Sequence, residues 1–158
     1  MNRKIVIIVS LLSILIIVLA CVIMSRPTSN VVICVVPQTV MGAIGQSFTI
    51  NISISNVVDL YGWRLKLRWD NAILNVMSAT EGGFLRSRGP TFFNQMNSTM
   101  SNLVLDCTLL GNVSGVSGNG ILVTIRFHAK GSGSCDLTLY DTTLVDSAEK
   151  TIIHAVVN

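Results

Sequence analysis

Seven residues, 63–69, alternate between apolar and cationic side chains without a break. The apolar parity comprises Trp63, Leu65, Leu67 and Trp69, and the cationic parity comprises Arg64, Lys66 and Arg68. Because successive side chains of a strand point to opposite faces, this period of two predicts a half-buried strand. A helix would scatter the cations around its surface and leave the two tryptophans on no common apolar stripe. We therefore expect a central strand of a sandwich, with its apolar face in the core and its cationic face toward solvent.

Short alternating or β-branched runs recur through residues 31–158, separated by glycine- and asparagine-rich turns. The expected strands are 31–36, 47–55, 63–69, 73–77, 91–96, 103–110, 121–129, 135–140 and 151–157. Residues 84–90 and 111–120 are expected to be loops. In the strand that begins at Ile121, parity places Ile121 inward and Leu122 outward. No helical period follows residue 30, so the pattern predicts an all-β fold, an antiparallel β-sandwich of about nine strands.

The start of the chain has a different character, because residues 5–24 form one apolar run with cations on both sides. As a helix this run would span roughly 30 Å, which matches the hydrocarbon core of a bilayer. Arg3 and Lys4 precede it and only Arg26 follows, so the N-terminus is expected in the cytoplasm and the domain outside. The expected organisation is a transmembrane or signal-anchor helix over residues 1–25, a linker over 26–30 and one domain over 31–158.

Whether this first segment is retained is left open by the sequence. Val18-Leu19-Ala20 offers a small residue at a signal-peptidase site, although the apolar run continues beyond it. With Cys21, the same residues resemble a bacterial lipidation motif, although no polar stretch follows the cysteine. An uncleaved segment predicts a single-pass protein of the cell membrane with an extracellular domain, and cleavage predicts a secreted one.

The net charge and the positions of the histidine, acidic and cysteine residues argue against several classes of function. The net charge of +3 comes from the N-terminal segment and linker, so residues 31–158 are neutral and carry no footprint for nucleic acid. His128 and His154 have no Asp or Ser at a catalytic spacing, and Asp141 is expected at a turn. The sequence also lacks a C-x-x-C zinc pair and an acidic calcium loop. We therefore expect no enzyme, no cofactor and no metal.

Three cysteines and three glycosylation sequons lie in the expected domain. One disulfide could form among Cys34, Cys107 and Cys135, but the sequence does not decide which pair. Cys107 and Cys135 both have the apolar parity of their expected strands, so two buried thiols are an equal alternative to a bridge. The sequons begin at Asn51, Asn97 and Asn112. They are candidate glycan sites, with Asn97 and Asn112 expected in use if the organism glycosylates.

Two sequence motifs resemble those of a known family. The first motif consists of Asp59-Leu-Tyr-Gly-Trp, then Leu65-Lys-Leu-Arg-Trp-Asp, then Ile73-Leu-Asn-Val. The second motif is Gly118-Asn-Gly-Ile-Leu-Val-Thr-Ile-Arg-Phe. From about Val31 the chain thereby resembles a cohesin module. The resemblance implies a jelly-roll sandwich that binds dockerin-bearing proteins, with any calcium belonging to the partner. One departure is Asn71, where the family usually has proline in the turn.

The resemblance also implies a partner face on the sheet that contains residues 63–69. Its outward positions in the family include Asn and Asp, whereas here they are Arg64, Lys66 and Arg68. These three cations are therefore candidate partner-binding residues for an acidic protein, and the alternative is an ordinary solvated strand face. The predicted function is a membrane-anchored, extracellular, non-catalytic module for protein–protein attachment.

The sequence also permits two alternative functions. A carbohydrate-binding module in polysaccharide capture would need coplanar exposed aromatics, and since Trp63 and Trp69 share the core parity, the candidates are Tyr61, Phe84, Phe92 and Phe93. A structural surface or filament subunit would form by strand exchange, because the family usually adds a last strand after a run such as 152–157. Three arrangements follow: residues 151–157 pair with 31–36 themselves, another protomer supplies a strand, or the chain is a fragment.

Overall fold

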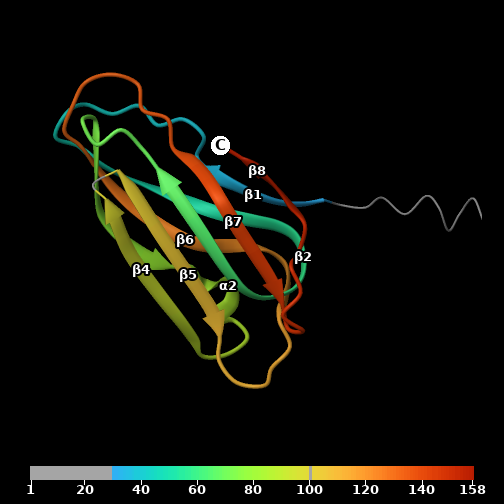
Figure 1. Cartoon of the computed structure of the whole chain (residues 1–158). Helices are drawn as coiled ribbons and strands as arrows, with labels where there is room; N and C mark the ends of the chain where they lie inside the picture. Colours follow the sequence, from blue (N-terminus) through green and yellow to red (C-terminus); the bar gives the residue numbers. More distant parts are fainter. Residues whose placement is uncertain (1–29, 100) are drawn as a thin grey trace, which may run out of the picture.

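The computed structural model describes residues 30–99 and 101–158, and these residues form an all-β fold (Figure 1). The elements are β1 (Val31–Val36), β2 (Ser47–Arg68), β3 (Leu74–Glu81), α2 (Gly83–Arg86), β4 (Thr91–Thr99), β5 (Asn102–Leu109), β6 (Val116–Ala129), β7 (Thr138–Asp146) and β8 (His154–Val157). The expected all-β class is therefore confirmed.

The long strand β2 takes part in both layers of the fold. Its first half pairs with β1 and β6, and its second half pairs with β5 and β7. Asn56 and Asp59, near the middle, adopt positive φ angles of 59° and 58°, where the register with β6 shifts. Such irregularities bend a strand and increase its twist, so one strand can pass from one layer to the other. The expected strands 47–55 and 63–69 are thus two halves of β2, which gives eight strands among the described residues instead of nine.

Two layers result from this crossing. One has the strand order β3-β6-β2-β1-β8, and the other consists of β4, β5, the second half of β2, and β7. Figure 1 shows β5 and β7 on either side of β2 in the layer nearest the viewer, with β6 behind it. The core lies between the layers, as expected for a sandwich.

The apolar parity of residues 63–69 lies in that core. Trp63, Leu65, Leu67 and Trp69 are all buried, which confirms the alternation argument. The Trp69 ring packs edge-on against Phe127 of β6 with 5.7 Å between centroids, and its Nε1 donates a hydrogen bond to the Leu74 carbonyl oxygen at 3.1 Å. Trp69 therefore connects the end of β2 with β3 and β6.

Three local expectations are wrong. Residues 83–86 form the short helix α2, which buries Phe84 and Leu85 where a loop was expected. Residues 116–120 belong to β6, because glycine lets this segment pass directly under Phe84: a Cβ on Gly120 would lie 2.3 Å from the Phe84 ring. Ile52 is opposite Val123 and Ser53 is opposite Ile121, so β6 has one extra residue, Leu122, at this point. The inward and outward positions of β6 are therefore exchanged before Val123: Leu122 is buried and Ile121 is exposed.

The last strand occupies the place beside the first. β8 pairs in parallel with β1, matching Val31 with His154 and Cys34 with Val157. The preceding segment joins the other layer, since the Ile152 N–H donates to the Leu144 carbonyl of β7. Of the three arrangements considered, the structure has the first, in which the chain's own final run pairs with β1.

The expected membrane segment, residues 5–24, lies outside the described residues. Among the residues that are described, no helix is long and apolar enough to cross a bilayer.

Candidate functional site

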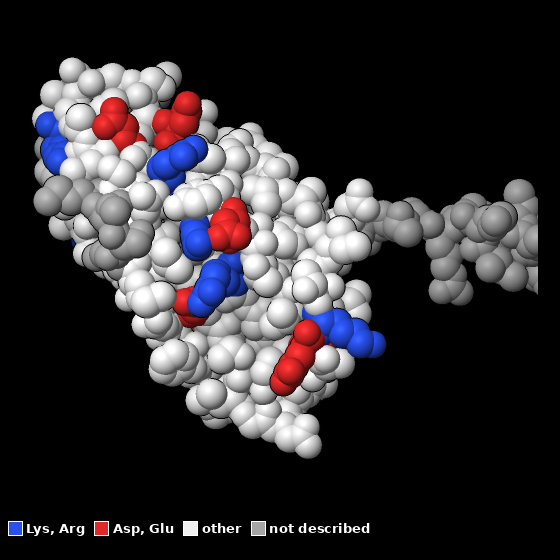
Figure 2. Space-filling view, in the orientation of Figure 1, with Lys and Arg blue, Asp and Glu red and all other residues white. Residues whose placement is uncertain are grey.

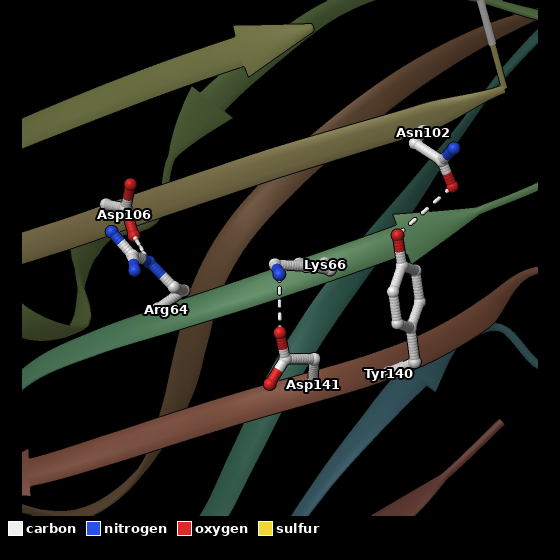
Figure 3. A network of polar contacts seen from close by, with 6 residues as sticks. All are labelled: Arg64, Lys66, Asn102, Asp106, Tyr140 and Asp141. Carbon is white, nitrogen blue, oxygen red and sulfur yellow. Dashed lines mark hydrogen bonds and ion pairs between the residues drawn. The ribbon is translucent and has the colours of Figure 1, made fainter. Parts of the chain in front are cut away.

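The second layer consists of β4, β5, the second half of β2, and β7, and its solvent-facing side is called the outer face. The three cations of β2 lie on this outer face. Arg64 Nε donates to Asp106 Oδ1 of β5 at 2.5 Å, and Lys66 Nζ is ion-paired with Asp141 Oδ2 of β7 (Figure 3). The Arg68 guanidinium lies 5.5 Å from the centroid of the Tyr140 ring. The candidate residues are therefore brought together, and each already has a partner on its own face.

A bulge in β7 makes this network. Arg64 is opposite Thr143 and Lys66 is opposite Tyr140, so β7 has one more residue than β2 over this interval. Asp141 lies in this bulge and adopts a positive φ of 47°. As a result two consecutive residues, Tyr140 and Asp141, both reach the outer face: the Tyr140 hydroxyl donates to Asn102 Oδ1 at 3.2 Å across β2 (Figure 3). Asp141 was expected at a turn, and its place within a strand corrects that expectation.

The ion pairs affect protonation in the expected directions. Hydrogen bonding and charge from Lys66 lower the pKa of Asp141, and Asp106 raises the pKa of Arg64 through the same two effects. Both pairs are partly solvated, with the Arg64 side chain 55% exposed, so each contributes little to stability. In Figure 2 the basic and acidic side chains of this side lie in adjacent pairs, so no continuous basic patch is formed.

A shallow hollow of about 500 Å³ lies beside the network on the outer face. Gly62 of β2 is among its lining residues, and its apolar lining includes Phe92 and Met96 of β4 and Val145 of β7. Phe92 is 58% exposed and Met96 is 47% exposed. This hollow was not anticipated from the sequence, because the four residues come from three strands that are distant along the chain.

The aromatic residues do not form a broad exposed platform. Trp63, Trp69 and Phe84 are buried in the core. Phe93 packs inward against Trp63 with 6.1 Å between ring centroids, and the Tyr61 hydroxyl donates to the Gly111 carbonyl at 2.6 Å. Of the four candidates for sugar contact, Phe92 is the one whose ring is mostly exposed.

The sequons occupy different environments. Asn51 lies within β2 between two neighbouring strands, and its Oδ1 accepts a hydrogen bond from Thr124 Oγ1 at 2.8 Å. Asn112 is exposed in the turn before β6. Asn97 lies near the end of β4. Glycosylation stays a prediction, and the exposed Asn112 has an environment that accommodates a glycan; intact-mass measurement would test it.

The sequence left a bridge and free thiols open as alternatives, and in the structure Cys34, Cys107 and Cys135 are free thiols. Cys107 is buried in β5, where burial and the neighbouring Glu81 carboxylate raise its thiol pKa. Cys135 precedes β7 and is only partly buried, in contrast to the expected strand 135–140. Across residues 30–99 and 101–158 no cluster of three or more His, Cys, Asp or Glu side chains could hold a metal ion.

Comparison with protein families matches residues 33–158 to the cohesin domain. A curated relative, cellulose-binding protein A of Clostridium cellulovorans, is 30% identical over an alignment of 122 residues that covers 71% of this chain. The same aligned region is only 6% of that relative's length. The match therefore concerns one module of a much longer protein.

Solved structures agree on the fold. The sixth cohesin of Acetivibrio cellulolyticus scaffoldin B, in complex with a Cel5 dockerin mutant, superposes with a TM-score of 0.69 at 16% identity over 82% of this chain and 96% of that one. A non-cellulosomal cohesin from the archaeon Archaeoglobus fulgidus gives 0.63 at 18% identity over 81% and 86%. A type I cohesin–dockerin complex from Clostridium thermocellum gives 0.66 at 16% identity over 81% and 89%.

Proposed function

Because the chain belongs to the cohesin family, whose model spans residues 33–158, we propose that its domain attaches a dockerin-type protein through the outer face. Cohesins are non-catalytic binding modules, and several of the similar structures were solved as complexes with dockerins. Attachment of one protein to another is the biochemical role, and the partner supplies whatever catalytic or surface activity the assembly has.

The observation that supports this face is the ordered side-chain network over β5, β2 and β7. Arg64, Lys66 and Tyr140 are held by neighbours on adjacent strands before any partner arrives. Side chains that are already positioned lose less conformational freedom on binding, which favours a defined interface. Arg64, Lys66 and Arg68 are accordingly the proposed contact residues.

Polysaccharide binding has less support. A flat sugar platform needs several exposed coplanar rings, and both tryptophans are in the core. Strand exchange also has less support, because β8 already pairs with β1 over residues 31–34. A filament subunit formed in that way would have to displace its own strand.

We also propose that residues 5–24 anchor the protein in the cell membrane with the domain outside. The support is the apolar run with its excess of preceding cations. Protease added to intact cells should remove the domain while leaving an N-terminal membrane-bound fragment. Full protection of the domain until the cells are lysed would contradict this orientation.

Charge reversal tests the proposed face. In the double variant Arg64→Glu with Lys66→Glu, four carboxylates would lie together, since Asp106 and Asp141 remain in place. We expect affinity for a binding dockerin, chosen from a panel of purified dockerin modules, to fall at least about tenfold, mainly through like-charge repulsion and loss of the ordered network. Surface-immobilised dockerins and the purified full chain would provide the measurement.

The matched control is Arg126→Glu, on the outer side of β6 in the other layer, where Arg126 is exposed. It changes charge by the same amount per residue and should leave affinity within about twofold. Equal losses in the double variant and the control would place the interface elsewhere, and failure of every dockerin to bind would contradict the dockerin proposal itself.

A further inference from the structure

The first strand, β1, is apolar on both of its sides. Ile33 and Val35 are buried in the core, whereas Val32, Cys34 and Val36 have the opposite parity and reach the solvent side of the layer β3-β6-β2-β1-β8. We call this side the back face, because it lies opposite the outer face across the core. Strands covered on both sides read as continuous apolar runs, whereas half-exposed strands alternate with polar residues. The sequence of β1 therefore has the pattern of a strand that is covered on the back face as well.

Apolar side chains continue from β1 onto the strands beside it. β8 runs next to β1 in register, so that outward residues of the two strands are neighbours (Figure 1). Ile121 of β6 shares the face, since it is opposite Ser53, which is itself opposite Cys34. The outward apolar residues of these three strands are Val32, Cys34, Val36, Ile121, Ala155 and Val157. Val36, Ile121 and Val157 are between 39% and 43% exposed, and a shared apolar surface of this kind marks an interaction site.

The charges of the back face are cationic. Arg126 and His128 of β6 point outward, because they are opposite Thr49 and Ser47 in the polar parity of β2. Among the described residues of β3, β6, the first half of β2, β1 and β8, no carboxylate reaches this face. Glu81 of β3 is turned inward and is only 4% exposed. An apolar surface bordered by cations and free of acids is complementary to a bilayer that contains anionic lipids.

The position of β1 in the chain places this face close to the proposed membrane segment. Residues 25–30 separate that segment from Val31, and they span at most about 20 Å when fully extended. β1 is therefore held near the lipid surface at a high local concentration. Under such tethering a contact that is weak by itself is sufficient to fix the orientation of the domain.

Charge distinguishes two ways in which a tethered domain can meet the membrane. End-on contact would present the end where β1 begins, beside the bend of β2 and the start of β8. Asp59 lies in this bend and accepts hydrogen bonds from Ser147, so the turn with Asp146 and Glu149 is adjacent to it. Anionic headgroups would repel this excess of acids. Contact through the back face brings no acid to the lipid.

We infer that the back face lies on the surface of the lipid bilayer, with the outward apolar side chains of β1 and β8 in the headgroup region and Arg126 beside anionic headgroups. This inference rests on the membrane anchor that is part of the proposed function. Because the back and outer faces are on opposite sides of the sandwich, the outer face then points away from the membrane and stays accessible to a protein partner.

Paramagnetic broadening from labelled lipids tests this orientation. The full chain, with ¹³C-labelled methyl groups, would be placed at one chain per nanodisc in discs of phosphatidylcholine and phosphatidylglycerol, some of whose headgroups carry a nitroxide. We expect the methyl signals of Val36, Ile121 and Val157 to lose at least about half of their intensity, because an interfacial surface lies within about 10 Å of the headgroups. Met96, which is 47% exposed on the outer face, should lose less than about a fifth, since the sandwich separates it from the lipid.

Every other pattern of broadening decides against the inference. Greatest losses at Val58 and Ile153, which are 71% and 92% exposed at the end where β1 begins, would show end-on contact. Equal losses on both faces would show that the domain has no preferred orientation. Broadening that is absent with one chain per disc, combined with shielding of the back face in discs that hold two chains, would identify a second copy as the occupant.

A charge variant gives the second measurement. Val36→Glu with Val157→Glu puts two carboxylates on the back face, so the Ile121 loss should fall to the level of Met96 while dockerin affinity stays within about twofold. The matched control, Val58→Glu with Ile153→Glu, adds the same charge at the end of the sandwich and should keep the Ile121 loss. Unchanged Ile121 broadening in the first variant would overturn the inference. If that variant fails to unfold cooperatively on heating, the pattern in the unaltered chain decides alone.

Failure of this inference and failure of the proposed function give different results. A chain that does not incorporate into the discs would contradict the anchor and, with it, the lipid contact, while dockerin attachment would stand. Incorporation without selective broadening of the back face would overturn the lipid contact alone. Broadening of the back face in a chain that binds no dockerin would contradict the proposed attachment and leave the lipid contact in place.

Discussion

Replacing Trp69 by alanine is expected to lower the free energy of unfolding by about 3–5 kcal/mol, the usual cost of deleting a buried aromatic side chain. Trp69 is 6% exposed and packs edge-on against Phe127, so its removal leaves a cavity where β2, β3 and β6 meet. The Leu74 carbonyl also loses the hydrogen bond from the indole. Urea unfolding followed by circular dichroism would measure the change without relying on tryptophan fluorescence.

Two further variants make this result specific. Trp69→Phe keeps an aromatic ring in the core and removes the indole N–H, so it should recover most of the loss and leave a deficit of about 1 kcal/mol or more. Val58→Ala changes a residue that is 71% exposed and should alter stability by no more than about 0.5 kcal/mol. A cost for Trp69→Ala no larger than that for Val58→Ala would show that Trp69 does not join the layers as described.

Gly82→Ala is expected to cost about 3 kcal/mol or more. A Cβ on Gly82 would lie 2.0 Å from the Ile121 carbonyl oxygen and 2.5 Å from its carbon, which are backbone atoms that cannot rotate away. The Gly82 N–H donates to the Leu122 carbonyl at 2.8 Å, so moving the chain aside would also break a hydrogen bond. Overpacking of this kind typically costs about 1–3 kcal/mol and more where the backbone must shift.

The neighbouring residue provides the control. Gly83 opens α2, and nothing lies within 4 Å of the position where its Cβ would be. Gly83→Ala should therefore be neutral or stabilise the protein by up to about 1 kcal/mol, because alanine loses less chain entropy than glycine. Equal unfolding midpoints for the two alanine variants would show that the Gly82 position is more open than described.

Much of the strand pattern was predictable because burial in this fold repeats with the period of the backbone. Residues 63–69 have four core members at every second position, and no other regular structure places them on one side. The same alternation places the three cations of this segment on the opposite face. The partners of Arg64 and Lys66 were not predictable, since Asp106 and Asp141 are distant along the chain from β2.

The strand faces differ from those expected by alternation where the period of two is interrupted. The register shift between Ile52 and Ser53 opposite β6 reverses the parity of Ile121 and Leu122. An extra residue in β7 brings Tyr140 and Asp141 to the same face, which alternation by itself forbids. A bulge is stabilised by the strands beside it, so local sequence reports it weakly.

The sequence by itself determined the all-β class, the main strands, the burial of both tryptophans and the family resemblance, because these depend on side-chain alternation and short words within single strands. Tertiary structure decided that β2 serves both layers and that β8 pairs with β1. The tertiary structure likewise decided that Arg64 and Lys66 pair with carboxylates on β5 and β7. It also decided that Gly62, Phe92, Met96 and Val145 surround one hollow. The physical reason is that strand pairing joins residues distant along the chain, and its register is set by packing across the whole sheet.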